Sequence, residues 1–158
     1  MSARHWKDYI FEDDYERNKD GTPWREFPPV IPLALVDPRI FDLALSFWTA
    51  PDAYLLTGYR RLEDIVRVRT EIDEHGQRLF VMAFGGDHPT SCWKGIRGGE
   101  QDGRVAFFAA AFKAYRNPRA HRESDEYSEQ LLDECLVLNH LIRLEDSAIL
   151  RGVSEARA

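Results

Sequence analysis

The segment Phe112-Lys113-Ala114-Tyr115-Arg116-Asn117-Pro118-Arg119-Ala120-His121-Arg122 marks a corner between two helical stretches of the chain. A strongly apolar stretch precedes it and a polar one follows. Asn117 stands before a proline, where helical backbone is disfavoured, so we expect the first helix to end near Arg116. The corner also places an arginine, an amide and a histidine within six residues. We interpret the rest of the chain as the scaffold that supports this corner.

Apolar residues recur at helical spacing on both sides of the corner. Before it, residues from about 101 to 116 are expected to form a helix in which phenylalanines flank three consecutive alanines. After it, Ser124 and the acidic residues beside it are typical of a helix start. Leucines then line that last helix to about residue 150. The corner is therefore expected to join the two main helices of the C-terminal half.

Further helices are expected upstream of the corner. Asp37-Pro38 is typical of an N-cap followed by a first-turn proline, and that helix should run to about residue 49. A second helix is expected from about Pro51 to residue 73, and a short one over residues 77–84. The charged face of the second helix is most simply interpreted as solvated; its residues are Arg60, Arg61, Glu63, Asp64, Arg67, Arg69 and Glu71.

Residues 85–103 hold six of the ten glycines. The stretch contains neither of the glycine patterns that cradle nucleotide phosphates, so a nucleotide loop is rejected. We interpret it instead as a mobile loop near the site or at a subunit interface.

No segment shows the alternation of a β-strand or the turn of a hairpin. The sequence therefore predicts an all-α fold, a bundle of four to five helices over residues 35–150. An irregular N-terminal arm, residues 1–34, is rich in aromatics and prolines and is expected to pack on its own domain, a twin subunit or a partner. Residues 151–158 are expected to be a frayed C-terminus.

Composition limits the classes of function. A length of 158 residues suits one domain, and the net charge of −6 argues against a general nucleic-acid coat protein. Cys92 and Cys135 form no metal-binding pair and are expected to be free thiols, and the histidines have no metal spacing. We expect no metal and no cofactor. No apolar run reaches a membrane span and the N-terminus has no apolar leader, so a cytoplasmic location without membrane contact is expected.

The corner has the residues for metal-free cleavage of RNA. Arg116 can hold a phosphodiester and stabilise negative charge that develops on it. His121 can take a proton from a ribose 2′-hydroxyl or give one to the leaving 5′-oxygen, and Asn117 can orient the imidazole. Three further cations, Lys113, Arg119 and Arg122, are candidates for RNA binding because no acid lies among them. The products would carry 2′,3′-cyclic phosphate and 5′-hydroxyl ends.

A purely structural interpretation of the same residues stays open. Arg-Asn-Pro is a common helix stop, Arg116 can pair with Glu123 or Asp125, and His121 can be an ordinary loop residue. Among the other histidines, His88 on the glycine-rich loop is the second candidate. Since one corner carries one histidine, the chemistry also predicts a symmetric dimer that brings two corners into one cleft.

Arg116-Asn117-x-x-x-His121 resembles the Arg-x(4–6)-His signature of the HEPN superfamily of all-helical domains. The wider segment, from Gly103 through Arg-Asn-Pro-x-Ala-His to the leucines of residues 131–144, is similar to the Ymh-type family of HEPN-like domains. Ala109-Ala110 departs from the glycine expected before the motif.

The resemblance implies a metal-independent endoribonuclease of a prokaryotic defence or toxin–antitoxin system. Arg116 and His121 would be catalytic and Asn117 supporting, in a composite cleft of a homodimer that an antitoxin or sensor protein holds inactive. The competing hypothesis is a non-catalytic HEPN-like module that binds RNA or a partner protein and assembles a complex.

Overall fold

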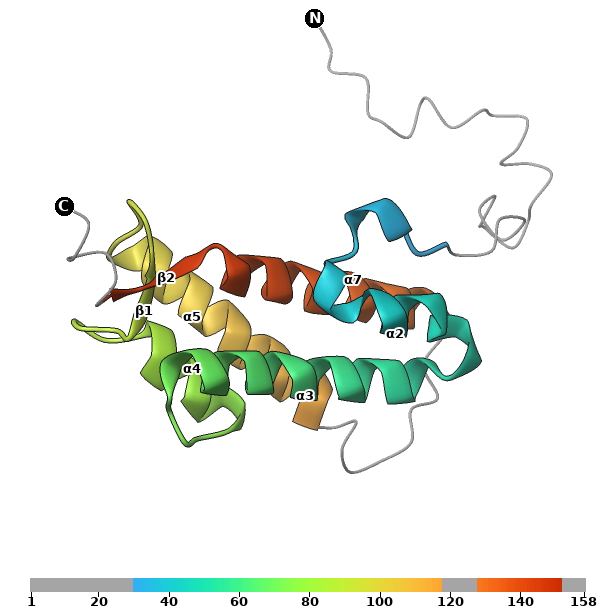
Figure 1. Cartoon of the computed structure of the whole chain (residues 1–158), viewed down its shortest axis with the longest axis horizontal. Helices are drawn as coiled ribbons and strands as arrows, with labels where there is room; N and C mark the ends of the chain where they lie inside the picture. Colours follow the sequence, from blue (N-terminus) through green and yellow to red (C-terminus); the bar gives the residue numbers. More distant parts are fainter. Residues whose placement is uncertain (1–29, 118–127, 152–158) are drawn as a thin grey trace, which may run out of the picture. The chain divides into compact units, whose positions relative to one another are not determined.

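Helices make up most of the computed structural model, which describes residues 30–117 and 128–151 (Figure 1). The α-helices in these ranges are α2 (Phe41–Leu45), α3 (Pro51–Thr70), α4 (Gly76–Phe84), α5 (Gly99–Ala111) and α7 (Ser128–Asp146). Short 3-10 turns, η3 (Leu33–Leu35), η4 (Pro38–Ile40) and η5 (Phe47–Thr49), surround α2, and a π-helical turn, η6 (Phe112–Arg116), continues α5. The predicted all-α bundle is confirmed. The expected arm and frayed terminus, apart from residues 30–34 and Arg151, lie outside the described residues.

A small antiparallel sheet is the feature that the sequence did not predict. Strand β1 (Ser91–Trp93) pairs with β2 (Ala148–Leu150), with Cys92 opposite Ile149. The last helix therefore ends at Asp146 rather than near residue 150. Three residues are too few to show strand alternation, and each strand exists because a distant segment supplies its hydrogen-bond partners.

The helix predicted from Asp37 to about residue 49 begins where expected, but it is not continuous. The Asp37 side chain accepts a hydrogen bond from the backbone N–H of Arg39, as an N-cap does. Instead of one helix to residue 49, the chain forms η4, α2 and η5 in succession. Pro51 then occupies the first turn of α3, where its missing N–H costs no helical hydrogen bond.

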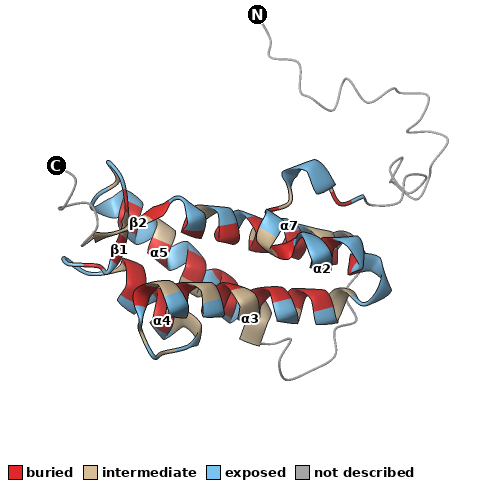
Figure 2. Cartoon of the chain, in the orientation of Figure 1, coloured by how far each residue is buried: buried red, intermediate tan, exposed pale blue. Residues whose placement is uncertain are grey.

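The core lies where α3, α4, α5 and α7 face one another, and Figure 2 shows their buried sides turned inward. α5 runs opposite in direction to α3 and α7 (Figure 1). Stacked aromatic rings join these elements. The ring centroids of Phe80 and Phe108 are 5.0 Å apart, and those of Phe84 and Trp93 of β1 are also 5.0 Å apart. Such ring pairs add to the stabilisation that burial of their apolar area provides.

The ends of the long helices are joined through Glu145, which is only 1% exposed. Its carboxylate accepts a hydrogen bond from Arg39 at 2.8 Å and another from Arg69 at 2.7 Å. The expectation that Arg69 lies on a solvated face is wrong, because its guanidinium forms an ion pair with the buried Glu145. A buried carboxylate held by two guanidinium groups connects η4, α3 and α7.

None of the helices within residues 30–117 and 128–151 combines the length and apolar character needed to cross a bilayer.

Candidate functional site

The predicted corner begins with a π-helical turn. After Ala111 the backbone of α5 widens into η6, which ends at Arg116, and Asn117 still has helical angles (φ −68°, ψ −47°). The helix thus extends one residue past the predicted stop, in spite of the following proline. π-turns inside α-helices occur frequently at functional sites. Arg119, His121 and Arg122 lie outside the described residues, as do Glu123 and Asp125.

Arg116 is held by a carboxylate on another helix. Its Nη2 donates to Oε2 of Glu63 on α3 at 3.3 Å. The other oxygen of Glu63 accepts the backbone N–H of Gly76, the first residue of α4, at 2.6 Å. The Glu63 carboxylate therefore links α3, the start of α4 and the motif arginine.

Glu63 was expected on a solvated face, and that expectation is wrong. The residue is 4% exposed, because it lies on the side of α3 that packs inward. Tyr59, one helical turn earlier, places its ring 5.2 Å from the ring of Phe112, four residues before Arg116. The pairs Tyr59–Phe112 and Glu63–Arg116 thus form two successive contacts between α3 and η6. The spacing Tyr59, Glu63, Val66 places Glu63 on the helical stripe of buried residues, a signal that the sequence does contain.

Two buried donors near this contact have no hydrogen-bond partner among the described residues: Arg116 Nε and the hydroxyl of Tyr59. Buried polar atoms without partners are rare in folded proteins and each calls for a structural explanation. Burial, with the charge of Glu134 on α7, raises the pKa of Tyr59 well above its usual range. Glu134 is itself 1% exposed. Two buried carboxylates are therefore close to these donors: Glu63 on α3, which bonds Arg116, and Glu134 on α7, whose charge acts on Tyr59.

Three of the six candidate residues can be placed. Lys113 is exposed, while Arg116 and Asn117 are partly buried; the side chain of Arg116 is 25% exposed. A guanidinium has five N–H donors in a fixed fork, and the bond to Glu63 occupies one of them. Donors of Arg116 other than Nη2 can therefore bind a phosphate while Nη2 stays bonded to Glu63.

The glycine-rich stretch does not lie beside Arg116 of the same chain. Its last residues, from Gly99 on, form the first turn of α5, whereas Arg116 is at the other end of that helix and its π-turn. At about 1.5 Å of rise per residue, roughly 25 Å separate the two ends. His88 belongs to this distant end, which corrects the expectation that the loop lies near the site. Whether the loop lies at a subunit interface stays a prediction.

Both cysteines are free thiols, as predicted. Cys135 is buried and its Sγ lies 3.3 Å from the hydroxyl of Tyr54, and burial raises the pKa of the thiol. A thiol of raised pKa is a poor nucleophile, which suits a packing role. Across residues 30–117 and 128–151 no three histidines, cysteines or carboxylates are grouped as metal ligands.

Comparison with known proteins gives a family match over most of the chain. The model of a family described as "Protein of unknown function (Hypoth_ymh)" matches residues 35–144, which include the corner and the helices on both sides of it. No curated protein and no solved structure matches the chain.

Proposed function

The chain belongs to the Hypoth_ymh family, and we propose that it is a metal-independent endoribonuclease of the HEPN type. The observation that carries the proposal is Arg116, a cation at the end of a π-turn that a buried carboxylate holds while 25% of its side chain stays exposed. The Arg-Asn-x-x-x-His pattern supplies the remaining groups. Held cations of this kind stabilise charge that develops on a phosphoryl group.

In the proposed reaction the 2′-oxygen of a ribose forms a bond to the adjacent phosphorus. The bond from phosphorus to the 5′-oxygen of the next nucleotide breaks. His121 accepts the proton of the 2′-hydroxyl, and an imidazolium returns a proton to the leaving 5′-oxygen. Arg116 donates hydrogen bonds to the non-bridging oxygens as negative charge grows on them. Asn117 orients the imidazole, and Lys113, Arg119 and Arg122 attract the RNA backbone.

The same proposal includes a homodimer. A single histidine would have to serve as both base and acid, whereas two apposed corners supply one imidazole for each role. We further propose that a defence or toxin–antitoxin system uses this activity, and that a partner protein restrains it in the cell. The HEPN resemblance of the motif supports these two points.

The test is RNA cleavage by the purified protein in EDTA, with chemical analysis of the product ends. Wild type should give 2′,3′-cyclic phosphate and 5′-hydroxyl ends, and a His121→Ala preparation should form these fragments at least about 10²-fold more slowly. Fragments with 3′-hydroxyl ends, or equal cleavage by both proteins, would refute the proposal.

A non-catalytic assembly module is the second candidate function. Large apolar side chains stand exposed on residues 33–48, an arrangement that marks interaction surfaces. They are Leu33, Leu35, Phe41, Leu45 and Trp48. Phe41, Leu45 and Trp48 follow one another at helical spacing. If wild type cleaves no RNA in EDTA, this function is the one that the structure supports next.

A further inference from the structure

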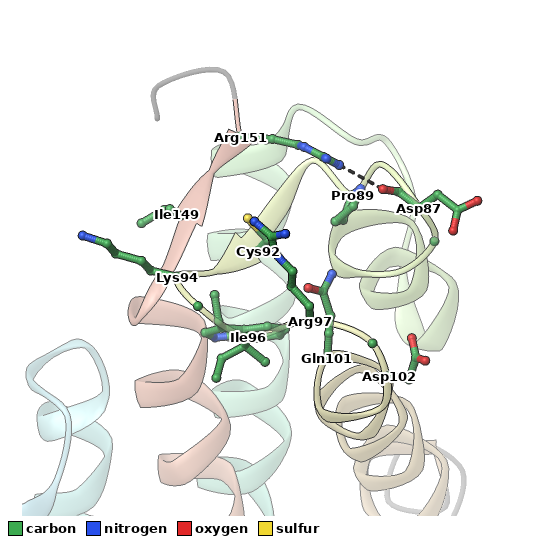
Figure 3. A pocket seen from close by; sticks show the side chains of 14 residues that line it. Asp87, Pro89, Cys92, Lys94, Ile96, Arg97, Gln101, Asp102, Ile149 and Arg151 are labelled. Atoms are coloured by element: carbon green, nitrogen blue, oxygen red, sulfur yellow. Dashed lines mark hydrogen bonds between the residues drawn. The ribbon is translucent and has the colours of Figure 1, made fainter. Parts of the chain in front are cut away.

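A pocket of about 710 Å³ lies at the end of the bundle where β1 and β2 pair (Figure 3). Three segments form it: residues 86–98, the first turn of α5, and residues 149–151 at the end of β2. Its volume is in the range of small-molecule sites. The helix α5 separates it from Arg116, so it is distinct from the candidate active site.

The walls of the pocket are held by bonds between distant segments. The backbone N–H of Arg151 donates to the carbonyl of Thr90 at 3.0 Å, and its guanidinium donates to the carbonyl of Asp87 at 3.1 Å. The Gln101 amide donates to the carbonyl of Phe84 at 2.8 Å. The indole of Trp93 donates to the carbonyl of Leu144 at 2.8 Å. These contacts give a pocket that exists before any ligand binds.

The cation that extends into the pocket is Arg97. Figure 3 shows it extending from the loop into the pocket, and no acid pairs with it among the described residues. Arg151 adds a second cation at the upper wall, while the carboxylate of Asp87 points outward. Asp102 lies in the first turn of α5, where the helix dipole already favours a negative charge. With Lys94, the lining has three cations against the two carboxylates of Asp87 and Asp102, and this net positive charge favours an anion.

The remaining wall is apolar, from Pro89, Ile96 and Ile149. A single inorganic ion would leave most of this volume unused. A ligand with a charged phosphate at one end and a planar or apolar body at the other would contact both parts. The guanidinium fork of Arg97 matches the oxygens of a phosphate.

We propose that this pocket binds a phosphate-bearing ligand of about mononucleotide size, with Arg97 as the main contact to the phosphate. Two sources have this chemistry, a free mononucleotide and the 5′-phosphate end of a short RNA. The inference does not depend on the proposed ribonuclease activity.

The test is calorimetric titration of the full chain with adenosine 5′-monophosphate, and with adenosine as the ligand that lacks the phosphate. We expect saturable binding of the monophosphate alone. Arg97→Gln should weaken it by about tenfold or more, the usual loss when a charge-assisted hydrogen bond is removed. Arg60→Gln is the matched control, because Arg60 is also exposed, lies on α3 and does not line the pocket. The Arg60→Gln protein should bind the monophosphate with the same affinity as wild type.

A trinucleotide with and without a 5′-phosphate identifies the source. If the phosphorylated trinucleotide binds more tightly than the monophosphate, the ligand is the 5′-phosphate end of an RNA. If it binds equally or less tightly than the monophosphate, the ligand is a free mononucleotide. The proposal is overturned if neither phosphorylated probe binds at about 1 mM. It is also overturned if Arg97→Gln and Arg60→Gln bind the probes equally well.

Discussion

Replacing His121 with alanine is expected to lower the rate constant of RNA cleavage by about 10²–10⁴-fold, the usual contribution of a general acid–base group. The imidazole is the group of the motif that can exchange a proton near neutral pH. Without it, the 2′-hydroxyl must lose its proton to water. The measurement is single-turnover cleavage of a labelled RNA in EDTA, with the affinity for RNA determined in parallel.

His88→Ala is the matched control for His121→Ala. His88 is exposed, lies between α4 and β1, and is at the end of the bundle away from Arg116. Its replacement should leave the rate constant unchanged. A comparable loss in both variants would contradict the assignment of His121, and a loss in His88→Ala alone would move the active site to the glycine-rich end.

Glu63→Gln is expected to reduce cleavage by about tenfold or more, because a misplacement of about 1 Å at a catalytic group can cost about 10²-fold in rate. The amide keeps the shape of the side chain and an acceptor for the N–H of Gly76. It loses the charge that holds Arg116, so the guanidinium is no longer restrained to one position. The loss should appear in the rate constant at saturating RNA more than in the affinity for RNA. Stability should fall by about 1–2 kcal/mol, as measured by urea unfolding.

Glu145→Gln separates this positioning role from simple stabilisation. Glu145 is also a buried carboxylate that arginines hold, but its partners are Arg39 and Arg69 rather than the motif. Its replacement should destabilise the chain at least as much as Glu63→Gln and leave cleavage by the folded protein unchanged. If both variants lose cleavage equally at the same folded fraction, Glu63 has only a structural role.

The positioning of Arg116 by Glu63 can also be tested by a measurement that does not depend on RNA cleavage. The buried Nε–H of Arg116 should give a slowly exchanging NMR signal in wild type. Glu63→Gln should speed its exchange with solvent, and Glu145→Gln should not. This comparison distinguishes failure of the positioning role from failure of the ribonuclease proposal.

The sequence by itself determined the elements whose signals are local. The spacing of apolar residues identified α3, α4, α5 and α7, and Asp37 and Pro51 marked helix starts that the structure confirms. Each of these signals depends on residues within one or two helical turns, so it can be recognised without knowledge of the fold. The place of Arg116 at the end of a helix was determined in the same way.

Tertiary structure alone decided the features that join distant segments. The paired residues of β1 and β2 are 55 to 59 positions apart in the sequence, from Trp93↔Ala148 to Ser91↔Leu150, and neither segment shows strand alternation by itself. The spacing of Glu63 from Tyr59 and Val66 places it on the buried stripe of α3, but only the tertiary structure supplies its partner, Arg116 on η6. A buried carboxylate is stable only where a partner offsets its desolvation, and that partner comes from 53 residues away. The packing of the helices therefore decided which buried charged side chains find a partner.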